Sequence, residues 1–144
     1  MTALSPFATA AIVALCTAGS PHMAQGAEPE TLTLACQGTL TDNIKPDAKS
    51  EQITMGIVVN LTARTVAGLT YPGLEEFPVV IRAASEVLIT FAGSNESGSS
   101  IIAGDINRVT GELWASSMMR DANTSNIVTS TTYSLKCGPT QRML

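Results

Sequence analysis

The chain has 144 residues with 12 acidic and 8 basic side chains, which gives a formal net charge of −4 at pH 7. This length corresponds to one domain, and the mildly acidic balance argues against nucleic-acid binding, which needs Lys and Arg gathered on one face. Three cysteines and one histidine restrict the metal and nucleophilic chemistry that is available.

The first segment, residues 1–26, has the pattern of a secretory signal peptide. No charged side chain precedes Glu28, and the apolar run in PFATAAIVALCTAGS is shorter than the about 20 residues of a membrane-spanning helix. The small residues of MAQGA predict cleavage near Gly26 or Ala27. We therefore expect residues 27–144 to form a single β domain that is periplasmic or secreted, with no membrane contact after cleavage.

A lipoprotein signal is the alternative interpretation of the same segment. In that case VALC would be the recognition box and Cys16 would carry the lipid. Leu15 is larger than the small residue that usually precedes a lipidated cysteine. We therefore favour ordinary cleavage, which removes Cys16 from the exported protein.

Beyond the signal, apolar and polar residues alternate with a period of two, which is typical of β-strands. Eight segments show this pattern: 31–37, 53–61, 64–69, 78–83, 87–92, 99–106, 111–120 and 126–137. In the segment 87–92 the residues predicted to face inward are Val87, Ile89 and Phe91. The sequence predicts an all-β antiparallel up-and-down meander of about eight strands without helix.

Turn-forming residues separate these segments. YPGL is a type II turn candidate, and SNESGSS is a polar loop. In INRVTGEL, Asn107 can bond the backbone ahead of it, and Gly111 suits a left-handed closing position. Residues 38–52 form the longest predicted connection.

Cys36 and Cys137 are the two cysteines that remain after signal removal, and both fall on the apolar faces of their segments. No CxxC spacing or nearby histidine points to redox or metal chemistry, so we expect a structural disulfide. This bond would place the first and last strands side by side and form a small closed or nearly closed barrel, filled by its own side chains. A two-sheet β-sandwich is the alternative.

Catalytic groups are scarce in the exported chain. The only histidine, His22, lies in the segment predicted to be removed, which excludes Ser-His-Asp and Cys-His mechanisms and the usual zinc sites. We expect no metal and no cofactor. The adjacent Glu75 and Glu76 are typical of a solvated loop, and Asp105 with Asn107 lacks the further ligands of a calcium loop.

One predicted strand, GELWASSMMR, suggests a contact surface. Its polar face carries Glu112, Trp114, Ser116, Met118 and Arg120. We expect Trp114 and Met118 to point outward, where such residues are over-represented at binding surfaces. Cover by a neighbouring strand, or by Met143 and Leu144, is the alternative. The loop YPGLEEF is the next candidate surface and contributes Tyr71, Glu75, Glu76 and Phe77.

With its signal segment and the stretches LTLACQG, INRVTG and YSLKCGPTQRML, the chain resembles the small exported uncharacterised proteins of alphaproteobacteria. This resemblance covers the whole chain and implies a periplasmic location, but it implies no activity. The chain is also loosely similar to the periplasmic inhibitors of c-type lysozyme. Ser97 and Gly98 match part of that family's inhibitory motif, but its tyrosine is missing, so no site residues are carried over.

Two classes of function follow. The first is an exported non-catalytic binding or inhibitor-type module whose partner is a periplasmic or extracellular protein. The second is a carboxylate-dependent hydrolase, or a lipocalin-like small-molecule carrier. A buried carboxylate pair in a cleft would favour the enzyme, and a flat exposed apolar patch would favour the binding module.

Overall fold

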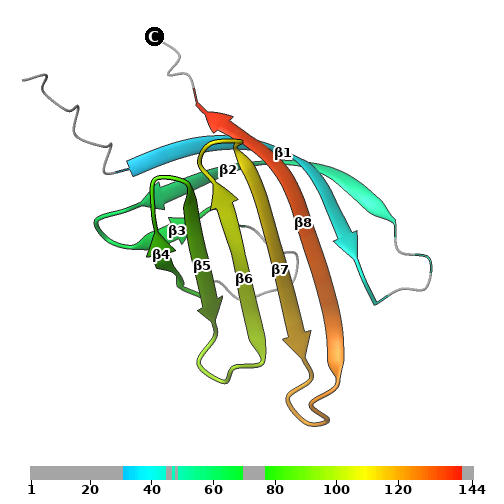
Figure 1. Cartoon of the computed structure of the whole chain (residues 1–144). Coiled ribbons are helices and arrows are strands. Elements are labelled where there is room, and N and C mark those ends of the chain that lie inside the picture. The colour runs from blue at the N-terminus through cyan, green and yellow to red at the C-terminus, as the bar shows by residue number, and fades with distance from the viewer. Residues whose placement is uncertain (1–30, 45–46, 48, 70–76, 141–144) are drawn as a thin grey trace, which may run out of the picture.

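The computed structural model describes residues 31–44, 47, 49–69 and 77–140, and within these ranges it contains strands and no helix. The strands are β1 (Thr31–Asp42), β2 (Ser50–Asn60), β3 (Thr65–Ala67), β4 (Val79–Ala84), β5 (Leu88–Ser94), β6 (Ser100–Asn107), β7 (Glu112–Arg120) and β8 (Ile127–Pro139). Each strand pairs antiparallel with the next, and β8 returns to pair with β1 (Figure 1). The predicted all-β meander and its closed barrel are confirmed, and the sandwich alternative is wrong.

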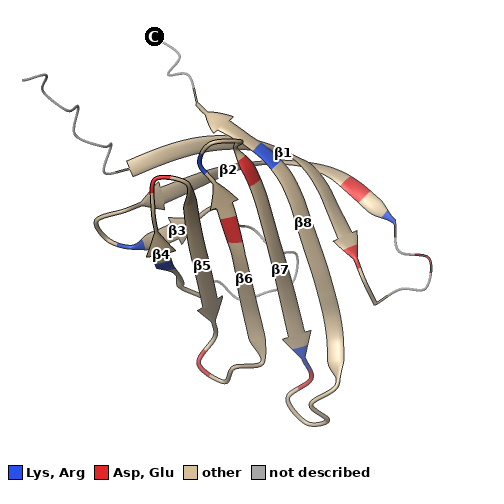
Figure 2. Cartoon of the chain, viewed as in Figure 1, with Lys and Arg blue, Asp and Glu red and all other residues tan. Residues whose placement is uncertain are grey.

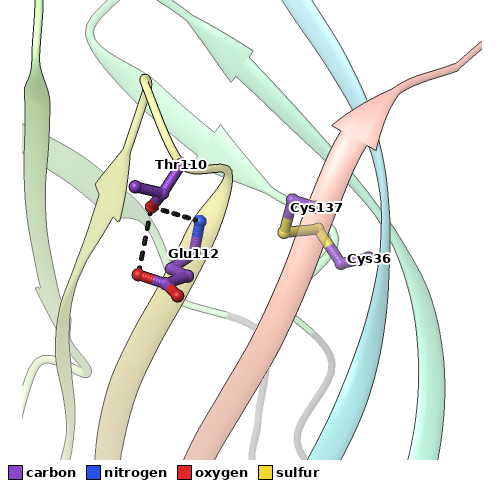
Figure 3. The surroundings of a disulfide bond; sticks show 4 residues. All are labelled: Cys36, Thr110, Glu112 and Cys137. Atoms are coloured by element: carbon purple, nitrogen blue, oxygen red, sulfur yellow. Dashed lines mark hydrogen bonds between the residues drawn. A yellow bond between two sulfur atoms is a disulfide. The ribbon is translucent and has the colours of Figure 1, made fainter.

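The closure depends on a long ladder between the first and last strands. It runs from Leu34 opposite Pro139 to Asp42 opposite Thr131. Within it Cys36 lies directly opposite Cys137, their Cα atoms are 4.0 Å apart, and the two residues form the predicted disulfide (Figure 3). The Cys137 N–H donates to the Gly111 carbonyl at 2.7 Å, so it points away from β1. The pair therefore occupies a non-hydrogen-bonded position, where opposing side chains come closest.

The barrel interior is filled by the inward-facing side chains of all eight strands. The largest fully buried residues are Tyr133, Phe91, Ile57, Ile89, Leu113 and Val59. Gly104 makes room for the Phe91 ring, since a Cβ atom at this position would lie 2.7 Å from the Phe91 Cζ. Ser117 is also fully buried, and its Oγ has no hydrogen-bond partner among the described residues. The interior is thus a packed core, as predicted, with an isolated hydroxyl in it.

The connection predicted at 38–52 is shorter than expected. β1 continues to Asp42 and β2 begins at Ser50, which leaves only residues 43–49 between them. Gly38 illustrates why, because it pairs with Ile53 in β2 and with Leu135 in β8. The ladder on both sides keeps this polar stretch extended, although its composition is typical of a loop.

Val87 was predicted to face inward, and this prediction is wrong. Its side chain is 53% exposed and precedes the first residue of β5. The Ser85 Oγ accepts the N–H groups of Val87 and Leu88, at 3.3 and 3.0 Å, and so holds a turn at this point. The strand therefore begins one residue later than predicted, at Leu88, and the predicted alternation holds for Ile89 and Phe91.

The predicted turn after β6 is confirmed. The Asn107 Oδ1 accepts the N–H groups of Val109 and Thr110, both at 3.0 Å, and Gly111 has a φ of 74°. Thr110 donates its hydroxyl to the Glu112 carboxylate at 3.0 Å (Figure 3). The YPGL turn lies outside the described residues.

A second polar turn connects β7 to β8. The backbone N–H groups of Thr124 and Asn123 donate to the Asp121 carboxylate, at 2.8 and 2.9 Å, and lower the pKa of this carboxyl below its usual value. Hydrogen bonds to the charged form of a carboxyl favour that form. Asp121 therefore acts as a local turn cap.

Candidate binding surface

The most exposed large aromatic side chain of the described barrel lies at the centre of β7. Trp114 is 51% exposed, whereas its chain neighbours Leu113 and Ala115 are buried in the core. The alternation predicted from GELWASSMMR is thus present, and Trp114 points outward. In register it lies between Asp105 of β6 and Ser134 of β8.

We call the outward side chains of three neighbouring strands the Trp114 face. It consists of Ile101, Ala103 and Asp105 of β6, Glu112, Trp114, Ser116 and Met118 of β7, and Ser134 and Lys136 of β8. Figure 1 shows these three strands side by side on one wall of the barrel. The face is therefore a continuous strip of sheet.

Apolar side chains extend this face toward the β7–β8 turn. Met118 is half-buried and lies in register between Ile101 of β6 and Ser130 of β8. Ile101 is itself exposed, at 39%. Trp114 and the Met118–Ile101 pair thus lie on one side of the sheet, four residues apart along β7, as the sequence predicted for Trp114 and Met118.

The charges on the face are unevenly distributed. Figure 2 shows acidic segments on β6 and β7 and a basic segment on β8. Glu112 pairs with Lys136 across the β7–β8 ladder, so the negative side chain of Glu112 has a positive side chain as its cross-strand neighbour. Asp105 lies between Thr90 and Trp114, neither of which is charged. Asp105, which lies beside the indole, is therefore the carboxylate of the face without a charged cross-strand neighbour.

Of the other predicted contact residues only Phe77 is described, and it does not join this face. Phe77 is half-buried, and its Cε2 would lie 3.1 Å from a Cβ atom at Gly93, on the side to which Ile89 and Phe91 also point. Phe77 thus covers the interior of the barrel near β5 rather than the outer surface of β7. Tyr71, Glu75 and Glu76 lie outside the described residues.

Asp105 joins this face through the pairing of β6 with β7 and not through the alternation within GELWASSMMR. In the sequence, Asp105 with Asn107 resembles only the start of a calcium loop. The signal that places it was nevertheless present, because the Asn107 turn sets the register of the β6–β7 hairpin. Counting back from that turn puts Asp105 opposite Trp114.

The described residues offer little for metal binding. They contain no group of three or more His, Cys, Asp or Glu side chains that could hold a metal ion. Cys36 and Cys137 are joined to each other, so neither provides a thiolate. The chemistry available on the Trp114 face is that of an indole, two carboxylates, the Lys136 ammonium and hydroxyl groups.

Comparison with known proteins adds no assignment: no protein-family model, no curated protein and no solved structure matches this chain. Within the described ranges, no helix is long and apolar enough to cross a membrane.

Proposed function

We propose that this protein is an exported, non-catalytic binding module and that the Trp114 face is its contact surface. The observation that carries the proposal is the position of Trp114, which is half exposed in the middle of a strand that is paired on both sides. The indole N–H makes no hydrogen bond with any described residue. Aromatic side chains with these properties are enriched in the cores of protein–protein interfaces, where they supply a large contact area.

The barrel is a suitable scaffold for such a surface. Three paired strands and the Cys36–Cys137 bond hold the face in a single conformation, so a partner would lose little free energy in ordering it. An inhibitor-type module depends on the same property, since a rigid face can occlude another protein without rearrangement. The partner we propose is a periplasmic or extracellular protein.

Export is the second part of the proposal. The disulfide is consistent with an oxidising compartment, because such bonds are rare in reducing ones. We propose that residues 1–26 are removed near Gly26 or Ala27 and that the protein is periplasmic or secreted. Intact-mass measurement of the exported protein tests this, and a full-length or lipidated main product would contradict it.

Capture of a partner tests the contact surface. The disulfide-bonded protein serves as bait for periplasmic extract, next to its Trp114→Ala variant. Val87→Ala is the matched control, because Val87 is exposed to the same degree, at 53% against 51%, and lies in the β4–β5 turn instead of on the Trp114 face. Truncating a central interface Trp typically costs more than about 2 kcal/mol of binding free energy. We expect Trp114→Ala to lose the captured protein and Val87→Ala to retain it.

Thermal unfolding of the same variants completes the test. A surface substitution usually changes stability by no more than about 0.5 kcal/mol, so both should melt close to the parent protein. Undiminished capture by folded Trp114→Ala would place the contact surface elsewhere. A large loss of stability in this variant would show that the indole supports the barrel instead.

A further inference from the structure

The carboxylate of Asp105 has no partner among the residues that the structure describes. Asp105 points outward from β6, is half-buried, and makes no hydrogen bond or ion pair with any other described residue. Its cross-strand neighbours are Thr90 and Trp114. The acidic side chain is therefore the direct cross-strand neighbour of the exposed indole, and the Cβ atoms of such neighbours are about 5 Å apart.

Neither Lys136 nor Arg120 is a cross-strand neighbour of Asp105. Lys136 lies opposite Glu112, one strand further from β6 than Trp114 itself. Arg120 is six residues from Trp114 along β7, which corresponds to about 20 Å at the usual rise of an antiparallel strand. Exposed charges at that separation are largely screened at physiological ionic strength, because the Debye length is about 8 Å. The nearest charged side chain of the Trp114 face on the β6 side of the indole is thus the carboxylate of Asp105.

We propose that Trp114 and Asp105 together form a cation site and that the partner of the Trp114 face inserts an arginine side chain into it. This inference rests on the proposed function, since it names the chemistry of the partner for the same surface. The indole face attracts a cation through its quadrupole, and Trp is the strongest of the aromatic residues in this respect. The adjacent carboxylate accepts hydrogen bonds from the same cation.

Arginine fits these two groups better than lysine does. A guanidinium is planar, so it stacks on the indole while its edge donates to the carboxylate in a fork. An ammonium is compact and strongly hydrated, and it cannot stack and donate in the same fixed geometry.

Fluorescence titration tests the site directly. Trp114 is the only tryptophan of the chain, so the emission of the protein reports on this position alone. The probe is the peptide acetyl-Arg-Arg-Arg-Arg-amide, and its counterpart contains citrulline at each arginine, which is nearly the same in shape but neutral. We expect the arginine peptide to change the emission in a saturable and salt-sensitive way, and the citrulline peptide to have no effect.

Two neutralising variants locate the charge that matters. Asp105→Asn should weaken binding of the arginine peptide about two- to fivefold, the range for an exposed ion pair. Glu112→Gln is the matched control, since it removes the same charge from the same face at a position where Lys136 already opposes it. We expect it to leave the affinity within the error of the titration.

The outcomes separate this inference from the proposed function. Equal responses to both peptides, no response to either, or equal effects of Asp105→Asn and Glu112→Gln would overturn the arginine site. If the captured partner is then lost with Trp114→Ala but fully retained with Asp105→Asn, the contact surface stands and the cation site does not. If Trp114→Ala keeps the partner, the proposed function itself fails.

Discussion

Reduction of the Cys36–Cys137 bond should lower the stability of the barrel substantially without changing its fold. The two cysteines are 101 residues apart, and the chain-entropy model gives about 4.7 kcal/mol for a loop of about 100 residues. In the folded state the bond joins residues that the β1–β8 ladder already holds opposite each other. Its main effect therefore lies in the unfolded chain, where it restricts the conformations of nearly the whole described domain.

Urea denaturation measures this effect. Because Cys36 and Cys137 are 1% and 8% exposed, reduction requires unfolding in the presence of reductant, followed by refolding under the same conditions. We expect the reduced protein to refold to the same far-ultraviolet circular dichroism spectrum, with a free energy of unfolding lower by about 3–5 kcal/mol. The urea dependence of that free energy should increase, because an uncrosslinked unfolded chain exposes more surface.

The Cys36→Ala/Cys137→Ala variant provides the matched control. It cannot reoxidise, but it also loses two buried sulfur atoms, so it should be less stable than the reduced parent protein. A difference below about 1 kcal/mol between the oxidised and reduced parent would refute the entropic reasoning, which assigns several times that value to a loop of this length.

Two further substitutions test the packing of the interior. Gly104→Ala should destabilise the barrel by about 1–3 kcal/mol in the same urea assay, because the new Cβ would lie 2.7 Å from both the Phe91 Cζ and the Ala115 Cβ. Unchanged stability of this variant would mean that the interior is looser than described. Ser117→Ala should leave the free energy of unfolding unchanged or raise it, because it removes a buried hydroxyl without a partner among the described residues. A decrease of more than about 1 kcal/mol would show that this hydroxyl is hydrogen-bonded in solution.

The closed barrel could be predicted because two independent signals agree. Alternation indicates which residues of each strand face inward, and Cys36 and Cys137 both fall on that side. A bond between the inward faces of the first and last strands brings them together, either side by side in a barrel or face to face in a two-sheet sandwich, and the β1–β8 ladder decides for the barrel. Neither signal alone distinguishes a barrel from an open sheet.

The extent of β1 and β2 could not be predicted in the same way. The residues that extend them, such as Thr39, Thr41 and Gln52, are polar and at least partly exposed. Their strand conformation results from backbone pairing with segments that are distant in sequence, and the composition of a segment does not indicate which distant segments it pairs with. Val87 shows the converse, because an apolar residue that fits the alternation is held in a turn by Ser85.

The candidate site lies between these two cases. The outward position of Trp114 follows from parity within one strand, and it was predicted. Its neighbour Asp105 lies on another strand, and the two meet only through the register of the hairpin. Composition and alternation along a single segment therefore identify the indole but not the charge beside it.

The arrangement of the barrel also makes its surface suitable for testing. Some surface side chains are hydrogen-bonded to the backbone of the barrel. Next to the short strand β3, for example, the Arg64 Nη2 donates to the carbonyls of Ile81 and Arg82 at 2.9 and 3.0 Å. A substitution there would change stability and binding together. Trp114 and Asp105 have no such hydrogen bonds to the described residues. Because stability comes from the interior and from the disulfide, a loss of binding caused by either of these two substitutions reports on the surface itself.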